Sequence, residues 1–253
     1  MNPVLVASGV NKSFGAVIAA ADLNIAIERE SIVGLIGANG AGKTTFVNMV
    51  TGYLKPTTGS IRFDGHELTR LEPRRVTQLG VSRSFQIPQL FNSLSVRENL
   101  LVAVGIVAAA AHAWAHSDLT PARADGATDE MLERFGLGAY RDRPAGLLPE
   151  GVRKLLDVAM GLVTRPRVLL LDEPTSGVSA DEKFAIMDLV MAAVRGADVT
   201  VLFVEHDMDV IARYAARVLA FADGRIIADG APADVLRDPE VRRYVIGEAD
   251  AHA

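Results

Sequence analysis

A glycine-rich segment in the first fifth of the chain constrains the fold more than any other feature. Residues 37–44 read Gly-Ala-Asn-Gly-Ala-Gly-Lys-Thr and fit the pattern G-x-x-x-x-G-K-[ST]. The unbroken apolar run at residues 32–36 predicts a buried strand before the pattern, and residues 44–50 predict a helix after it. A strand, a glycine-rich loop and a helix in this order predict a phosphate-binding loop in an α/β protein.

The predicted loop has the residue types that nucleotide phosphates require. Glycines let consecutive backbone N–H groups point at phosphate oxygens, and the N-terminus of the helix adds its dipole. We expect Lys43 to bridge the β- and γ-phosphates and the Thr44 hydroxyl to ligate Mg²⁺. The residues expected to contact the nucleotide are Gly37, Ala38, Asn39, Gly40, Ala41, Gly42, Lys43, Thr44 and Thr45. The alternative is a glycine-rich turn that only caps a helix.

The remaining apolar runs indicate how the sheet is built. Buried parallel strands are predicted at residues 168–171 and 199–204, with polar residues at their carboxyl ends, where α/β sheets place their ligand sites. Short alternating runs predict an N-terminal antiparallel β layer, and two further runs flank a turn and predict a hairpin. Those runs are residues 4–7, 23–27 and 61–63, then 218–221 and 225–228 around Asp223-Gly224. The predicted fold is α/β, with a mainly parallel sheet.

The middle of the chain, residues 95–160, contains no convincing strand and is interpreted as a helical subdomain inserted within a single domain of residues 1–253. It combines an alanine-rich helical run, a polar stretch at residues 117–128 interpreted as a turn region, and apolar residues at helical spacing. The spaced apolar residues are Met131, Leu132 and Phe135.

Three candidate catalytic residues follow the two late strands. Asp172 and Glu173 end the first of them, where Asp172 could hold Mg²⁺ through its water shell and Glu173 could polarise the water that attacks the γ-phosphate. His206 follows the second strand and could contact the γ-phosphate. The alternatives are a plain strand-to-loop exit for the acidic pair and a structural role for the histidine.

Composition excludes several classes of function. The 253 residues carry 26 basic and 31 acidic side chains, and a net charge of -5 disfavours nonspecific nucleic-acid binding. A chain without cysteine forms no disulfide and no thiolate zinc site. The apolar run at residues 100–111 is shorter than the roughly 20 residues of a spanning helix, and the N-terminus lacks the pattern of a signal peptide. We therefore expect a chain that docks onto a membrane at most.

Taken in order, these motifs resemble the nucleotide-binding subunits of ABC transporters over nearly the whole length. The resemblance implies a P-loop ATPase core with ATP and Mg²⁺ as cofactors. It also implies that Phe14 stacks on adenine, where the alternative is an ordinary core phenylalanine. Gln86 matches the glutamine that senses Mg²⁺ and the attacking water and couples the site to the membrane subunits, where the alternative is an exposed loop glutamine.

Two segments depart from the family pattern. The signature Leu-Ser-Gly-Gly-Gln, which closes over the nucleotide of the opposite subunit, is replaced by Leu148-Pro149-Glu150-Gly151-Val152. Pro149 offers neither a hydroxyl nor an N–H, and Glu150 adds negative charge near a polyanion. Ser179 stands at the interface-loop position where the family often has aspartate. These departures suggest an asymmetric heterodimer whose partner carries an intact signature; the alternative is a competent subfamily variant.

Within the family, residues 83–86, 94–100 and 239–249 resemble the ATP-binding subunits of branched-chain amino acid importers, a group that also serves amides, urea and aromatic acids. The implied partners are transmembrane permease subunits, a second ATP-binding subunit in a homo- or heterodimer and, indirectly, an extracytoplasmic solute-binding protein, but no nucleic acid. The implied location is peripheral, on the cytoplasmic face of the cell membrane. The alternatives are a non-catalytic or regulatory ATP-binding cassette and a soluble ABC-type protein of translation or DNA repair.

Overall fold

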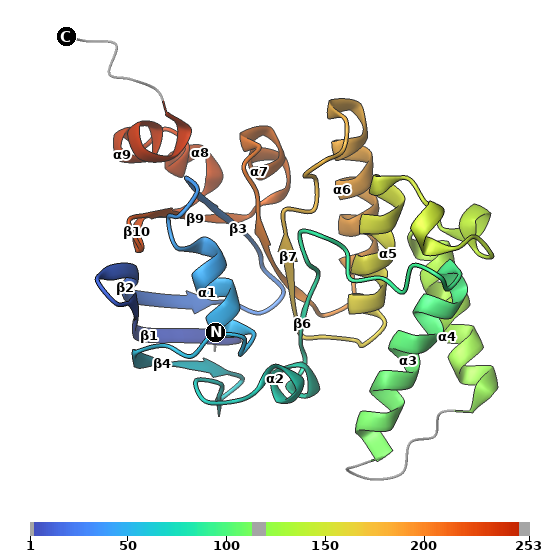
Figure 1. Ribbon diagram of the computed structural model, residues 1–253. Helices are drawn as coiled ribbons and strands as arrows, with labels where there is room; N and C mark the ends of the chain where they lie inside the picture. Colours follow the sequence, from blue (N-terminus) through green and yellow to red (C-terminus); the bar gives the residue numbers. More distant parts are fainter. Residues whose placement is uncertain (1–2, 113–119, 248–253) are drawn as a thin grey trace. The chain divides into compact units, whose positions relative to one another are not determined.

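The computed structural model describes residues 3–112 and 120–247 (Figure 1). The chain divides into two compact units, Met1–Thr77 with Thr200–Ala253 and Gln78–Val199. Each unit has its own strands and helices.

The first unit contains the expected antiparallel β layer. Its four strands lie in the order β2-β1-β4-β5 and are β1 (Leu5–Phe14), β2 (Val17–Ile27), β4 (Thr58–Phe63) and β5 (His66–Glu67). The register pairs Leu5 with Ile27 and Phe14 with Val17, so β1 and β2 form one long hairpin. Both strands are longer than the alternating runs at residues 4–7 and 23–27 predict, because bulges interrupt the alternation without ending the pairing.

The same unit contains strands of a second sheet, in the order β10-β9-β3-β8. The third strand in this order is parallel to both of its neighbours, and the first two strands form the predicted hairpin. These strands are β3 (Ile32–Gly37), β8 (Thr200–Val204), β9 (Arg217–Ala222) and β10 (Arg225–Gly230). Every residue of β8 is buried, and so is β3 from Val33 onward, as expected of strands that helices cover.

Short helices complete this unit. Helix α1 packs on the second sheet through Phe46, whose ring lies 6.0 Å from that of Phe221 on β9. The helices are α1 (Lys43–Val50), α7 (Met208–Tyr214), α8 (Pro232–Val235) and α9 (Pro239–Val241), which a π-helical turn, Arg242–Ile246, follows. Helix α2 (Pro73–Leu79) runs across the boundary between the two units.

The second unit is mostly helical. Its strands β6 (Val81–Arg83) and β7 (Val168–Asp172) are parallel, with Arg83 paired to Leu170. Helix α5 packs against α3, α6 and β7, and α4 packs against α3 and α6. The helices are α3 (Val96–His112), α4 (Pro121–Arg134), α5 (Glu150–Leu162) and α6 (Ala180–Val194), with 3₁₀ turns at Gly138–Tyr140 and Ala145–Leu147. None of the helices among the described residues is both long and apolar enough to span a membrane.

The predicted α/β class is confirmed. The prediction of a turn region at residues 117–128 is wrong for the residues of this stretch that the structure describes. Residues 121–128 belong to α4, whereas residues 117–119 lie outside the described residues. The helix starts there because the Thr120 hydroxyl accepts a hydrogen bond from the Arg123 N–H at 3.3 Å and proline occupies the first helical position. The short strand β6 was also not predicted, because three residues carry too little periodicity.

Candidate functional site

The glycine-rich loop connects β3 to α1 by a backbone path that only glycine permits at two points. A Cβ on Gly37 would lie 2.5 Å from the carbonyl oxygen of Phe221, and a Cβ on Gly42 would lie 2.7 Å from that of Ala19. Gly42 also has a φ of 108° as the residue that caps α1. These glycines therefore fix how the loop passes its neighbours and enters the helix.

The positive charge of the loop is held by the loop itself. Lys43 is buried, and its ammonium group donates hydrogen bonds to the carbonyl oxygens of Gly37 (2.5 Å) and Ala38 (3.1 Å). Residues 38–40 and Thr44 are exposed, and Thr45 is half-buried. A fixed cation beside exposed backbone and a helix N-terminus is the arrangement that binds phosphate.

A turn elsewhere in the first unit supports the loop, which the sequence did not reveal. Gly224, between β9 and β10, donates its N–H to the carbonyl of Ala41 at 3.0 Å and accepts from the N–H of Ala21 at 2.8 Å. The loop, the hairpin turn and β2 are thus joined through backbone atoms alone. Sequence pattern identifies Asp223-Gly224 as a turn but does not indicate what the turn contacts.

His206 lies at the same sheet edge as the phosphate loop. In the parallel pair β3 and β8, Leu35 lies opposite Val204. Gly37 follows Leu35 by two residues, and His206 follows Val204 by two residues, so both lie at the carboxyl ends of these neighbouring strands. His206 is exposed, and its backbone N–H donates to the carboxylate of Glu205 at 3.2 Å. Glu205 is buried, and its own N–H reaches the carbonyl of Leu35 at 3.3 Å. The histidine is therefore anchored at its backbone beside the strand that carries the loop.

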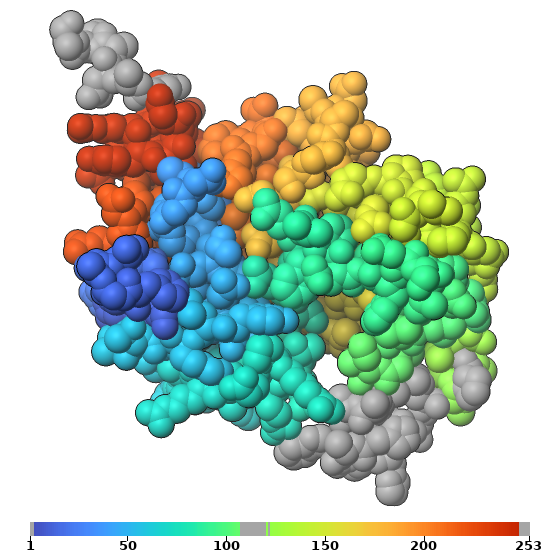
Figure 2. Space-filling model, viewed as in Figure 1, coloured from blue at the N-terminus to red at the C-terminus, as the bar shows by residue number. Residues whose placement is uncertain are grey.

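Phe14 is at the end of β1, and 52% of its surface is exposed. The ammonium of Lys12 lies 5.0 Å from the centre of its ring. The neighbouring hydrophobic residues Val17 and Ile18 are also exposed and lie near the tip of the β1–β2 hairpin. Figure 2 shows this N-terminal segment, in dark blue, at the surface of the protein. The alternative of a core phenylalanine is wrong, and the ring is accessible to a stacking partner.

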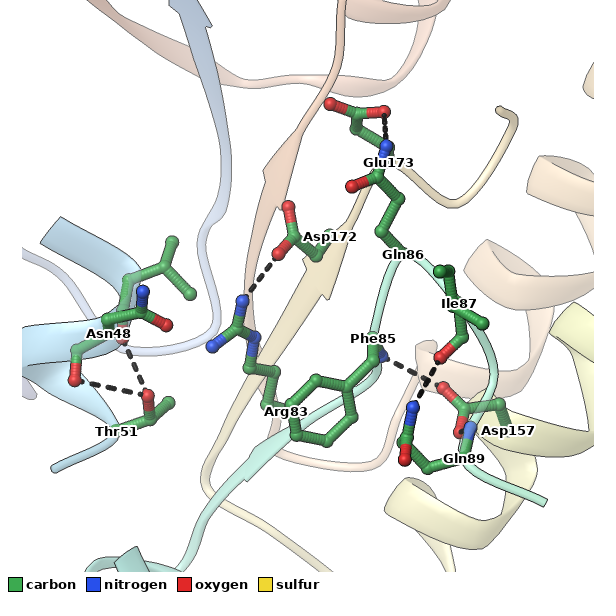
Figure 3. A network of polar contacts seen from close by, with 11 residues as sticks. Asn48, Thr51, Arg83, Phe85, Gln86, Ile87, Gln89, Asp157, Asp172 and Glu173 are labelled. Atoms are coloured by element: carbon green, nitrogen blue, oxygen red, sulfur yellow. Dashed lines mark hydrogen bonds and ion pairs between the residues drawn. The ribbon is translucent and has the colours of Figure 1, made fainter. Parts of the chain in front are cut away.

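In the second unit, Asp172 ends β7 in a buried ion pair with Arg83, which ends β6 (Figure 3). The guanidinium Nη2 lies 2.5 Å from the carboxylate Oδ2, and both side chains are 8% exposed. A buried pair of this kind is strongly destabilised when one partner is removed, because the other charge is left unpaired. Asp172 is therefore held by a specific cation, a partner that the sequence pattern did not assign to it.

The side chains of Gln86 and Glu173 meet just beyond the ends of β6 and β7. The side-chain Nε2 of Gln86 donates to the carboxylate Oε2 of Glu173 at 2.8 Å (Figure 3). Glu173 has a φ of 51°, a left-handed conformation that is uncommon for a residue with a side chain. Gln86 is exposed, as the alternative supposed, but it is hydrogen-bonded to the predicted catalytic carboxylate.

The altered signature segment is the start of helix α5. Leu148 is buried, Pro149 occupies the capping position without a side-chain hydrogen bond, and Glu150 is the first helical residue. The Glu150 carboxylate lies 3.7 Å from Nε of Arg153, and its charge near a helix N-terminus is favourable. A Cβ on Gly151 would lie 2.9 Å from Cδ1 of Ile186 on α6, so this glycine allows the two helices to approach closely.

Ser179 caps helix α6. Its N–H and its hydroxyl both donate to the carboxylate of Glu182, at 3.3 and 2.9 Å. The contacts with Glu182 belong to a capping box, and the hydroxyl contact needs a donor that an ionised aspartate lacks, so the structure gives a local reason for serine where the family often has aspartate.

The candidate metal ligands supply the oxygen atoms that Mg²⁺ prefers. They are the Thr44 hydroxyl in the first unit and the Gln86 amide and Asp172 carboxylate in the second. Mg²⁺ is usually held by one or two carboxylates together with substrate phosphates. The donor chemistry of these residues therefore fits the ion.

A buried strand that runs into a phosphate-binding loop, with a second strand that ends in an acidic pair, defines the class of P-loop ATPase cassettes. Among solved structures, the ADP conformation of MJ1267, an ATP-binding cassette of an ABC transporter, superposes with a TM-score of 0.85 at 29% identity, covering 98% of this chain and 100% of that one. CbiO1 from Clostridium perfringens, part of the ABC transporter complex cbiONQ, gives a TM-score of 0.83 at 28% identity, covering 96% and 94%.

The sequence profile of the family described as ABC transporter matches residues 20–176, and the chain belongs to this family. It is 34% identical to the high-affinity branched-chain amino acid transport ATP-binding proteins BraF of Pseudomonas aeruginosa and LivG of Escherichia coli, covering 98% of this chain and 99% of each relative. It is 32% identical to the lipopolysaccharide export system ATP-binding protein LptB of Haemophilus influenzae, covering 97% and 98%. The chain is an ATP-binding subunit of a transporter.

Proposed function

We propose that this subunit hydrolyses ATP to drive the import of branched-chain or related amino acids. The observation that supports catalysis best is the pair of contacts at the ends of β6 and β7, where Arg83 holds Asp172 and Gln86 holds Glu173. The 34% identical relatives are branched-chain amino acid transport ATP-binding proteins, which supports the solute class. The alternative solutes are amides, urea and aromatic acids.

Each site residue has a specific role in this proposal. Lys43 and the loop residues 37–45 bind and orient the phosphates, and Phe14 stacks on the adenine ring. Glu173, oriented by Gln86, accepts hydrogen bonds from the attacking water and polarises it, while His206 contacts the γ-phosphate. Thr44, Gln86 and Asp172 would hold Mg²⁺, which would neutralise charge that develops on the phosphates.

The proposed assembly follows from the same family membership. The chain is one ATPase domain, residues 1–253, with an inserted helical subdomain at about residues 95–160. It works peripherally on the cytoplasmic face of the membrane with permease subunits and a second ATP-binding subunit, and a solute-binding protein delivers the solute. No nucleic acid takes part.

The altered signature favours a second subunit that differs from this one. Pro149 begins α5 without a side-chain cap, and Glu150 is negative and exposed. A segment of this kind offers little to the γ-phosphate of an opposite subunit. In the proposed heterodimer, the partner's signature closes over the nucleotide held by this chain, and the composite site completed by residues 148–151 turns over slowly. If the reconstituted complex hydrolyses no ATP at all, the chain is instead a non-catalytic or regulatory cassette.

The substitution Glu173→Gln in the reconstituted transporter tests the catalytic proposal. It preserves size and the contact with Gln86 but removes the negative charge, so ATP binding is retained while turnover falls. Removing one well-aimed catalytic group typically costs about 3–4 kcal/mol, or roughly 10²- to 10³-fold in rate. The matched control is Glu133→Gln, an exposed residue on α4. Hydrolysis by Glu173→Gln at the wild-type rate would refute the assignment.

The solute is tested by uptake into proteoliposomes that contain the whole complex. ATP-dependent accumulation of leucine, isoleucine or valine supports the importer proposal. Transport of only urea, amides or aromatic acids would replace the solute class, and ATPase activity without any uptake would contradict import.

A further inference from the structure

Helix α5 carries two buried charged side chains of opposite sign, one turn apart. Lys154 and Asp157 are only 4% and 8% exposed, although α5 is otherwise packed through apolar residues. Burying an isolated charge is costly unless it is paired and hydrogen-bonded. Apolar packing of the helix therefore does not explain why these two charges are buried, and their contacts must compensate for the cost.

Asp157 uses both of its carboxylate oxygens to hold the segment that contains Gln86. Oδ2 accepts the backbone N–H of Phe85 at 3.0 Å, and Oδ1 accepts that of Gln89 at 3.1 Å. Figure 3 shows the carboxylate facing this segment from α5. Because one carboxylate receives N–H groups on both sides of Gln86, the backbone there cannot move relative to α5 without losing a charge-assisted hydrogen bond.

Lys154 contacts the same segment and the segment after β7. Its ammonium donates to the carbonyl of Glu173 and the hydroxyl of Ser176, each at 3.0 Å, and approaches the carbonyl of Gln86 at 3.4 Å. The two residues whose side chains meet at 2.8 Å, Gln86 and Glu173, are thus both tied at their backbones to one ammonium group. These contacts all lie within the second unit.

The electrostatics agree with the geometry. Burial raises the pKa of Asp157 to about 6, an effect that the hydrogen bonds from Phe85 and Gln89 and the positive charge of Lys154 partly oppose. The carboxyl is thus ionised at neutral pH, when both oxygens accept hydrogen bonds.

We propose that Asp157 and Lys154 are positioning residues for ATP hydrolysis, which tie the backbone at Gln86 and Glu173 to the helix that begins at the signature segment. Because α5 starts at Glu150, a force applied to that end of the helix is transmitted to the Gln86–Glu173 pair through these hydrogen bonds. The inference rests on the roles proposed above for Gln86 and Glu173.

The test compares Asp157→Ala and Asp157→Asn in the complete transporter with the control Asp142→Ala, an exposed residue of the same unit. Small misplacements of a catalytic group cost up to about 100-fold in rate, so we expect Asp157→Ala to lower kcat by about 10- to 100-fold while KM for ATP changes less than about twofold. Asp157→Asn keeps one acceptor oxygen and should fall between Asp157→Ala and the wild type. Lys154→Met should lower kcat in the same way.

A double-mutant cycle with Gln86→Ala separates positioning from general destabilisation. If Asp157 acts through Gln86, then Asp157→Ala reduces kcat much less when Gln86 is already alanine, whereas a merely structural residue gives additive effects. Circular dichroism identifies any variant that does not fold, and Asp157→Asn then provides the cycle. Additive effects, or a wild-type kcat for Asp157→Ala, would overturn the inference. An overturned inference leaves the proposed function intact as long as the wild-type complex hydrolyses ATP and the Glu173→Gln complex does not.

Discussion

The burial of Asp157 makes the free energy of unfolding depend on pH in a way that Asp157→Asn removes. The pKa of this carboxyl rises from 3.8 to about 6 in the folded chain, mainly because burial disfavours the charged form. Between these values the folded state retains a proton that the unfolded state has released. The contribution of the group to stability is therefore complete below the unfolded pKa and is lost as the pH rises through about 6.

The size of the effect follows from the two pKa values. Since one pKa step is worth about 1.4 kcal/mol, the full contribution is about 3 kcal/mol, of which about 1.4 kcal/mol remains at about pH 5 and almost nothing at about pH 7.5. The asparagine variant has no ionisable group at this position. We expect the wild type to gain about 1.4 kcal/mol relative to Asp157→Asn when the pH falls between these two values.

Urea unfolding of both proteins, followed by far-ultraviolet circular dichroism at the two pH values, measures this difference. The Asp142→Asn variant, with an exposed aspartate replaced in the same unit, corrects for the loss of one negative charge. A difference between wild type and Asp157→Asn that is independent of pH, or that grows as the pH rises, would refute the reasoning. It would mean that the hydrogen bonds from Phe85 and Gln89 outweigh the cost of burial.

Three further substitutions test the site. Gly42→Ala forces a Cβ to within 2.7 Å of the carbonyl of Ala19, so we expect a loss of unfolding free energy of about 1–3 kcal/mol in urea. The loss should exceed that of Gly136→Ala, where φ is also positive but the space is open, and equal losses would contradict the clash. Phe14→Ala should weaken ATP binding, measured with a fluorescent analogue, by about 1–3 kcal/mol and leave stability within about 0.5 kcal/mol, whereas Phe14→Trp should bind normally. Unchanged binding would argue against stacking. In a chain that also carries Glu173→Gln, Pro149→Ser should raise the residual ATPase rate of the reconstituted pair about fivefold by adding one hydrogen bond of about 1 kcal/mol to the slow composite site, and an unchanged residual rate would count against such a site.

The elements that the sequence predicted well are those with strong local patterns. The buried strand, glycine-rich loop and helix around Lys43 were placed within a residue of their ends, because an apolar run, fixed glycines and a helical stretch coincide there. The strand before Asp172 was predicted for the same reason. The start of α4 was missed because the polar residues that follow Thr120 suit a turn as well as an exposed helix face, although the Thr120-Pro121 pair was an available signal.

The supporting residues could not be predicted from local pattern. Arg83 and Asp172 are far apart in the sequence and meet only because β6 and β7 are parallel neighbours. Lys154 and Asp157 resemble the polar face of an ordinary amphipathic helix, and only tertiary packing makes them buried. The backbone contact of Gly224 with the phosphate loop has no side-chain pattern at all. Long-range contacts of these kinds require the folded chain.

The paired contacts at the ends of β6 and β7 also fix a length. Arg83 and Gln86 lie three positions apart, yet they reach the consecutive residues Asp172 and Glu173. The two residues between them are anchored as well, since the Ser84 N–H donates to the carbonyl of Leu170 at 2.8 Å and the Phe85 N–H donates to the carboxylate of Asp157 at 3.0 Å. One residue more or fewer would leave at least one of the two carboxylates without its partner. Descendants of this sequence can therefore exchange side chains near residues 83–86 far more readily than they can insert or delete a residue there.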